Sequence, residues 1–212
     1  MLRLIADSIS DCIKIGIYKG NEKLFSVEKQ GMALENFFDL LSEACSKANV
    51  EIGEIQELIF CEGTGSVLGI RCASVSFFSI ANLSGAKVFT YNIFDIARYL
   101  CFKKNVEKAQ IICDSKKGFY NLLELDSSKN TNPLELSYED FEKIKGENIF
   151  YLKQRAKQVV KEEFTELSYT IDDIFDAINS NEKTFLVEAI EVKDALLLSK
   201  REFVKWNLQA DI

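Results

Sequence analysis

The chain has 212 residues, 47% of them hydrophobic, and its 33 acidic side chains outnumber its 26 basic ones to give a formal net charge of −7. This length supports one large domain or two small ones, and the acidic balance argues against binding nucleic acid through the overall charge. The sequence contains no histidine, which excludes Ser-His-Asp and Cys-His catalysis and zinc sites of the HExxH type.

The cysteines indicate a reducing compartment. None of the six forms a CxxC pair, so a zinc or redox motif has no support, and we expect reduced, buried thiols. The apolar N-terminal stretch at residues 1–7 is too short for a signal peptide. No apolar run approaches the ~20 residues needed to span a bilayer. We therefore expect a cytoplasmic protein without membrane contact.

The first half of the chain predicts an antiparallel meander followed by alternating helices and strands. Residues 13–18 alternate between isoleucine and other side chains, which is the period of a strand. Apolar residues within 33–48 recur at steps of three and four, which is the period of a helix. The expected elements are strands at 2–8, 12–18 and 23–27, a helix at 33–48, a strand at 57–61, a helix at 73–83, a strand at 87–91 and a helix at 93–102.

The polar segment 103–105 is the predicted boundary between a first domain, 1–104, and a smaller second domain, 105–212. The second half opens, like the first, with strand, turn and strand. Its expected elements are strands at 109–114 and 119–125, a short element at 134–137, a helix at 138–143, a strand at 148–152, and helices at 156–166, 171–179 and 184–198. The lysines and arginine within 145–161 favour a solvated helix face balanced by nearby glutamates over a basic patch.

A glycine-rich segment joins the strand at 57–61 to the next helix. It reads Gly63-Thr64-Gly65-Ser66-Val67-Leu68-Gly69-Ile70-Arg71. It is not a P-loop, because Arg71 stands where that motif requires lysine followed by serine or threonine. It is not a dinucleotide fingerprint either, because its third glycine, Gly69, falls one residue late. Two interpretations stay open: a sharp turn with close helix–sheet packing, or a backbone cradle for an anion.

Two pairs of adjacent aromatic residues suggest an interaction surface. Phe37-Phe38 and Phe77-Phe78 cannot both point inward on a single helix stripe. Apolar surface left outside the core is common at protein–protein interfaces, although a wide, fully buried helix face is the alternative. The candidate interface residues are Leu34, Phe37, Phe38, Leu41, Phe77 and Phe78.

The order of these elements resembles the bacterial TsaB (YeaZ-like) family of the actin-like, Hsp70-like ATPase superfamily. The matching residues are Ile5-Ala6-Asp7-Ser8, Cys61-Glu62-Gly63-Thr64-Gly65-Ser66 and Gly69-Ile70-Arg71. The chain departs from the family at Val67-Leu68, where Phe-Thr is usual, and it lacks a recognisable Pro-x-Tyr-x-Arg segment near 195–201. The resemblance implies two tandem actin-like (RNase H-like) α/β domains with mixed sheets and flanking helices. The second domain is abbreviated, with a C-terminal helix that could return to the first.

The resemblance also implies a non-catalytic subunit of the complex that forms N6-threonylcarbamoyladenosine in tRNA. Its expected partners are a second copy of itself, a TsaD-type transferase and a TsaE-type ATPase, with tRNA bound only through the complex. No metal or cofactor of its own is expected, and ATP or ADP would bind weakly only at a complex interface. Asp7 and Asp114 are candidate vestigial acids for a nucleotide or metal, and their alternative role is to cap turns at strand ends.

Two other functions remain open. An ATP-dependent small-molecule kinase of the same superfamily would need a second glycine-rich phosphate loop, whereas Gly118 and Gly146 are isolated. A divergent relic would keep the fold after losing its partner. No residue supports proteolysis.

Overall fold

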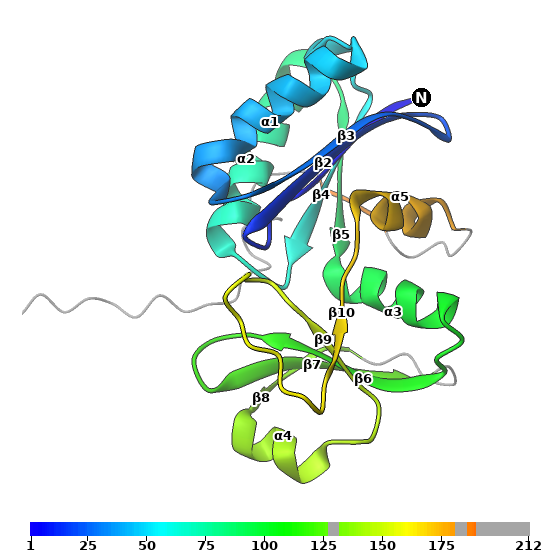
Figure 1. The fold of residues 1–212 in the computed structure, drawn as a ribbon. Helices are drawn as coiled ribbons and strands as arrows, with labels where there is room; N and C mark the ends of the chain where they lie inside the picture. Colours follow the sequence, from blue (N-terminus) through cyan, green and yellow to red (C-terminus); the bar gives the residue numbers. More distant parts are fainter. Residues whose placement is uncertain (127–131, 181–185, 190–212) are drawn as a thin grey trace, which may run out of the picture.

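The computed structural model describes residues 1–126, 132–180 and 186–189, and it contains two mixed β-sheets (Figure 1). The first has six strands in the order β11-β5-β4-β1-β2-β3, and the second has five in the order β10-β9-β6-β7-β8. Helix α3, at Ile93–Lys103, lies between the two sheets in the chain. The predicted α/β class with two mixed sheets is confirmed.

The first sheet begins with the predicted antiparallel meander. Strand β1 pairs with β2 in a register that places Asp7 opposite Lys14, and β4 and β5 extend the sheet in parallel. The elements are β1 at Leu2–Asp7, β2 at Cys12–Lys19, β3 at Glu22–Gln30, α1 at Ala33–Ala48, a short 3-10 turn at Ile52–Glu54, β4 at Glu57–Gly63, α2 at Val67–Ser84 and β5 at Lys87–Asn92.

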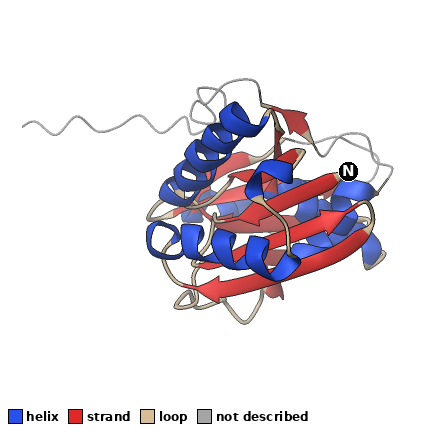
Figure 2. Ribbon diagram, turned by 90° about the horizontal axis from the view of Figure 1, so that it is seen from above, coloured by secondary structure: helices blue, strands red, loops and turns tan. Residues whose placement is uncertain are grey.

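The two faces of this sheet have different covers (Figure 2). Helices α1 and α2 pack on one face, against β2, β3 and β4. Helix α5, at Ile171–Asn179, packs with α3 on the other face. Because side chains alternate along a strand, Ile13, Ile15 and Ile17 share the α1/α2 face, while Lys14 and Tyr18 share the α5 face.

Helix α2 begins earlier than the sequence suggests. It starts at Val67 rather than at residue 73, and the hydroxyl of Ser66 caps it by accepting the N–H of Gly69 at 3.2 Å. By length and composition α2 could also cross a membrane, with a mean hydropathy of 1.4. Its packing between α1 and the strands β4 and β5 is that of a core helix.

The second sheet is smaller and has an aromatic core. Tyr120, Phe141, Tyr151 and Phe164 form a cluster in which the last two rings stack with centroids 6.2 Å apart. The elements are β6 at Lys108–Asp114, β7 at Phe119–Asp126, β8 at Leu134–Ser137, α4 at Tyr138–Ile144, β9 at Ile149–Leu152 and β10 at Thr165–Leu167. The chain then returns to the first sheet through α5 and β11, at Val187–Glu188.

Two predicted helices of the second half are wrong where the structure describes them. Residues 156–166 form an irregular segment that leads into β10, because Phe164 is drawn into the aromatic core and no continuous apolar stripe opposes it. Within the expected helix at 184–198, Val187 and Glu188 instead pair with β5. The remainder of that prediction lies outside the described residues, apart from 186 and 189.

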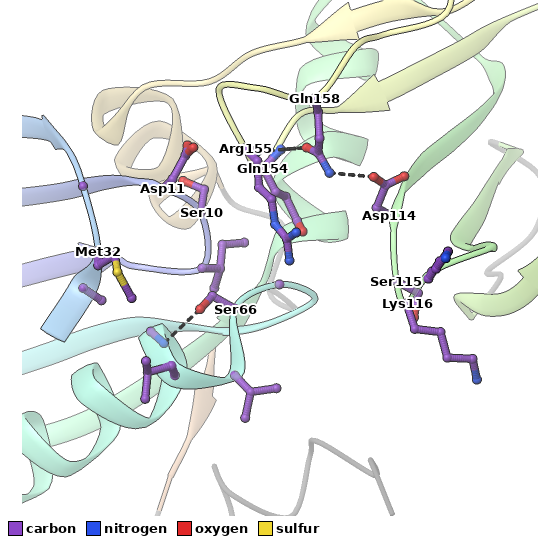
Figure 3. Close-up of a pocket in the computed structure, with 18 of the residues that line it drawn as sticks. Ser10, Asp11, Met32, Ser66, Asp114, Ser115, Lys116, Gln154, Arg155 and Gln158 are labelled. Carbon is purple, nitrogen blue, oxygen red and sulfur yellow. Dashed lines mark hydrogen bonds between the residues drawn. The ribbon is translucent and has the colours of Figure 1, made fainter.

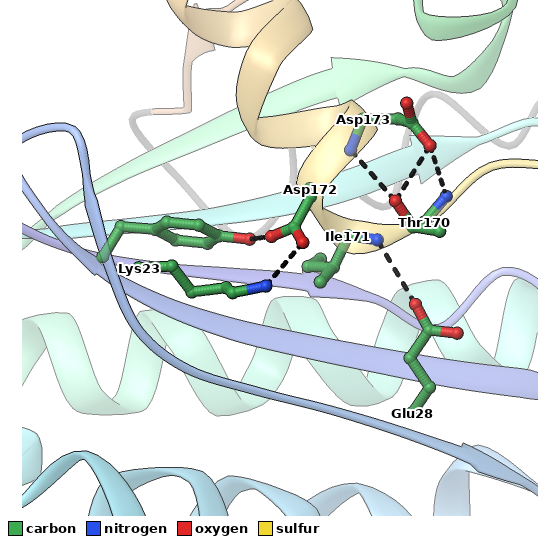
Figure 4. Close-up of polar contacts among 7 residues, drawn as sticks. Lys23, Glu28, Thr170, Ile171, Asp172 and Asp173 are labelled. Carbon is green, nitrogen blue, oxygen red and sulfur yellow. Dashed lines mark hydrogen bonds and ion pairs between the residues drawn. The ribbon is translucent and has the colours of Figure 1, made fainter.

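Helix α5 is fixed to the first sheet by ring stacking and by polar contacts, which Figure 4 shows. The Tyr18 ring stacks on Phe175 with centroids 3.9 Å apart. Its hydroxyl donates to Asp172 at 2.9 Å, and Lys23 contacts the same carboxylate at 2.6 Å. Thr170 and Asp173 form a capping box at the start of the helix. The segment after β10 is therefore held on β1 and β2.

One buried hydroxyl in α2 yields a stability prediction. Within the described residues, the Ser74 hydroxyl is buried without a hydrogen-bond partner. A buried unpaired polar group costs about 1–3 kcal/mol, so Ser74→Ala should raise the free energy of unfolding by about 1 kcal/mol. Urea denaturation monitored by circular dichroism measures this change.

The matched control is Ser76→Ala in the same helix. Ser76 is also buried, but its hydroxyl donates to the carbonyl of Cys72 at 2.6 Å. This variant should show no gain in stability, because the serine it replaces already has its partner. An equal gain in both variants would attribute the effect to helix propensity and contradict the prediction.

Candidate functional site

A cleft of about 590 Å³ lies where the two sheets meet (Figure 3). Its lining comes from several segments. They are the β1–β2 turn with Ser10 and Asp11, residues 31–33 at the start of α1, the glycine-rich segment with Ser66, the β6–β7 turn with Asp114 to Lys117, Tyr138 at the start of α4, and the stretch from Gln154 to Gln158. We name residues 153–158, which contain this last stretch and lie between β9 and β10, the strap.

The glycine-rich segment uses its lack of side chains for packing within the chain. A Cβ on Gly65 would lie 2.6 Å from the carbonyl oxygen of Ile9, and one on Gly69 would overlap the carbonyl oxygen of Ser8. The N–H of Ser66 donates to the Ile9 carbonyl at 2.7 Å. The close-packing interpretation of these glycines therefore has direct support, because the β1–β2 turn fills the space that they leave.

Asp7 is fully buried and its carboxylate is occupied by donors from the chain itself. It accepts the backbone N–H of Ile9 at 3.2 Å and the hydroxyls of Tyr91 at 3.3 Å and Tyr169 at 2.9 Å. Burial, and then the neighbouring Asp7 charge, raise the pKa of both tyrosines well above the usual value. These three donors occupy three of the about four acceptor sites of the carboxylate.

Asp114 and Asp11 are bound by the strap. The side-chain amide of Gln158 donates to Asp114 at 2.6 Å, and the backbone N–H of Ala156 donates to Asp11 at 2.6 Å. Gln154 donates to the carbonyl of Thr64 at 2.5 Å. The strap thus connects both sheets and the glycine-rich segment across the cleft.

The structure brings together only some of the predicted site residues. Asp114, Gly65, Ser66 and Gly69 line the same cleft, whereas Asp7 does not appear in its lining. Gly63 ends β4, and Arg71 lies in the second turn of α2. Within residues 1–126, 132–180 and 186–189, no group of three or more histidine, cysteine, aspartate or glutamate side chains is placed to hold a metal.

A second feature is an apolar surface on the outer side of α1 and α2. Phe38 is 60% exposed and Leu34, one turn earlier, is 58% exposed. Leu68 and Val75 on α2 are exposed as well. The first turn of α1 lies close to α2, because the Cys72 thiol is 3.9 Å from the carbonyl oxygen of Ala33. We name these four side chains the α1/α2 apolar surface.

Comparisons with known proteins identify solved structures with the same fold. No family model matches the sequence, and no curated protein matches it. YeaZ from Pseudomonas aeruginosa aligns with a TM-score of 0.65 at 13% identity, over 92% of this chain and 97% of that one. A structure described as an uncharacterized protein with similarity to peptidase YeaZ from Pseudomonas aeruginosa aligns with a TM-score of 0.61 at 12% identity, over 84% and 89%. This chain has the YeaZ fold.

Four of the six predicted interface residues are in the core of this YeaZ-like structure. Phe37, Leu41, Phe77 and Phe78 are buried. Helix α2 packs on both α1 and the sheet, and the ring of Phe77 lies 6.0 Å from those of Phe37 and Phe60. The apolar face of α2 is therefore wide enough to bury two adjacent aromatic residues, and only the Phe37-Phe38 pair divides between inside and outside.

Leu68 and Val75 were missing from the predicted interface. They are seven residues apart, which places them on one face of a helix. The spacing becomes visible only when the helix starts at Val67, so treating residues 67–71 as loop concealed it. The N-cap signal was present, since a serine at position 66 precedes an apolar run.

The Asp7 cluster yields a pH-dependent prediction. Tyr169→Phe removes a buried hydrogen bond to a charged acceptor and should cost about 2 kcal/mol of stability near neutral pH. A tyrosine whose folded pKa is raised stabilises the fold below its unfolded pKa of about 10 and loses that contribution as pH rises further. The free energy of unfolding of wild type should therefore exceed that of Tyr169→Phe by less and less above about pH 10. The difference should shrink by up to about 1.4 kcal/mol per pH unit.

Urea denaturation of both proteins between about pH 8 and pH 11 measures this difference. Tyr91→Phe is the companion variant, because it removes the other tyrosine hydroxyl from Asp7, at 3.3 Å, and should show the same dependence on pH. If the difference in the free energy of unfolding between wild type and Tyr169→Phe stays constant or widens above pH 10, burial of a neutral tyrosine against Asp7 is contradicted.

Proposed function

We propose that this chain is a TsaB-type subunit that acts in the cytoplasm as a non-catalytic partner of a TsaD-type transferase in forming N6-threonylcarbamoyladenosine in tRNA. The observation that carries the proposal is the YeaZ fold over 92% of the chain, together with an exposed Phe38 on a helix that covers the first sheet. The matching glycine-rich segment supports the same assignment.

The hydrogen bonds that the acidic residues accept support a non-catalytic role. Asp7 is buried under two tyrosines, and Asp114 is bound by Gln158. The sequence also has no histidine, the usual general base at neutral pH. The kinase alternative needs a carboxylate ready to act as base in the cleft, so we do not propose it. In this proposal, ATP or ADP binds only at the interface of the complex.

The α1/α2 apolar surface is the proposed contact with another copy of the chain or with the TsaD-type partner. Large apolar side chains that cluster outside a core mark protein–protein interfaces, and aromatic residues contribute strongly to such contacts. A TsaE-type ATPase would join this complex, and tRNA would bind only through it. The lysines of the second half support the absence of direct tRNA binding in this proposal. Lys145 and Lys161 form ion pairs with glutamates, namely Glu142 and Glu163.

A charge placed on this surface should prevent assembly. Phe38→Asp should weaken association with the organism's TsaD-type protein at least ~100-fold, because a buried carboxylate without a partner costs several kcal/mol. The stability of the isolated chain should change by less than about 0.5 kcal/mol, since the side chain is exposed. Size-exclusion chromatography with light scattering and titration calorimetry measure these effects.

Val159→Asp is the matched control, because Val159 is 92% exposed and lies far along the chain from α1 and α2. It should bind like wild type. In a strain that lacks the gene, wild type and Val159→Asp should restore the modified nucleoside in tRNA, whereas Phe38→Asp should not. Normal tRNA modification without this gene would reject the function. Full binding by Phe38→Asp would reject only this interface.

A further inference from the structure

Lys14 is an unusual residue in the centre of β2. It is only 6% exposed, although lysine is almost never buried unless it is paired. Its ammonium contacts the carbonyl oxygen of Cys12 at a long 3.4 Å and lies 4.7 Å from the centre of the Tyr169 ring. Among the described residues, no carboxylate oxygen lies within 4.0 Å of it. A buried cation with such weak contacts is costly.

Lys14 lines a cavity of about 290 Å³ on the α5 face of the first sheet. Arg155 of the strap lines the same cavity, and no carboxylate in the described part of the chain pairs with its guanidinium. Gln30 and Ser168 add polar groups to the wall. The wall therefore holds three cations, with Lys153 as the third, and two carboxylates, those of Asp11 and Glu166, so that the cations are in excess by one.

The neighbouring acids already have partners. Asp7 accepts from two tyrosines and Asp11 from the N–H of Ala156. Glu28, opposite Lys14 on β3, accepts from the N–H of Ile171 at 3.3 Å, and Glu166 lies 3.7 Å from Lys153. These contacts satisfy the carboxylates locally. In the described part of the chain, the Lys14 ammonium keeps only its long contact to Cys12 and its position over the Tyr169 ring.

We propose that this cavity binds a small oxyanion, a phosphate or carboxylate group, between the Lys14 ammonium and the Arg155 guanidinium. Hydrogen bonds between charged partners are about twice as strong as neutral ones, and Arg and Lys are the residues that recognise phosphate and carboxylate oxygens. The volume suits an inorganic anion or the anionic end of a small molecule. The ligand would offset the cost of burying Lys14.

Titration calorimetry on the full chain tests the site, with inorganic phosphate and acetate as separate probes at constant ionic strength. At least one probe should bind wild type saturably. Lys14→Met and Arg155→Gln should each weaken that binding by ~10-fold or more, because each removes a charge-assisted contact to the anion. Lys157→Gln, an exposed lysine of the strap, should bind like wild type.

The exposed Arg155 keeps the test decisive even if Lys14→Met does not fold. Saturable binding that Arg155→Gln weakens and Lys157→Gln leaves unchanged supports the site. The proposal is overturned if neither anion binds saturably, if Arg155→Gln binds like wild type, or if Lys157→Gln loses affinity equally, which would indicate diffuse attraction. The relative affinities of phosphate and acetate identify which chemical group the site prefers.

Discussion

The buried carboxylate of Asp7 is the contact on which much of the architecture depends. It accepts from a backbone N–H just after β1, from Tyr91 on β5 and from Tyr169 just before α5. A single side chain thus connects β1 to β5, the next strand but one in the sheet, and to a segment more than 160 residues later in the chain. An ionised carboxylate can stay buried only with such partners. The return of the chain from the second sheet to the first is therefore also what covers Asp7.

In the cleft between the sheets, polar groups are likewise hydrogen-bonded by other residues of the chain. The β1–β2 turn fills the space beside Gly65 and Gly69, and the strap binds Asp11, Asp114 and the carbonyl of Thr64. Loops that cradle an anion leave backbone N–H groups directed at the ligand. Here the N–H of Ser66 is used by Ile9 and that of Gly69 by the Ser66 hydroxyl. The contacts that cross the cleft are those of the strap.

The sequence predicted elements whose signal is local and missed those decided by tertiary contacts. Alternation along β2 and three- and four-residue spacing in α1 each reflect one buried face, and both elements were found. The early start of α2 was missed because a glycine at position 69 suggests a loop, whereas it is required by the close approach of Ser8. The prediction of a helix at 156–166 was wrong because Phe164 joins an aromatic core to which other strands contribute. The Tyr169–Asp7 contact has no local signature at all, since its partners are far apart in the chain.

The two proposed binding sites occupy opposite faces of the first sheet. Phe38 and Leu34 lie on α1, above the face that presents Ile13, Ile15 and Ile17, and Lys14 projects from the other face toward α5. The two proposed sites therefore share no side chain. The strap is the element that could couple them, because Arg155 lines the cavity while Gln154 holds the carbonyl of Thr64, three residues before α2. A change in affinity at one site caused by occupancy of the other would have to pass through this segment, and by linkage it would be equal in both directions.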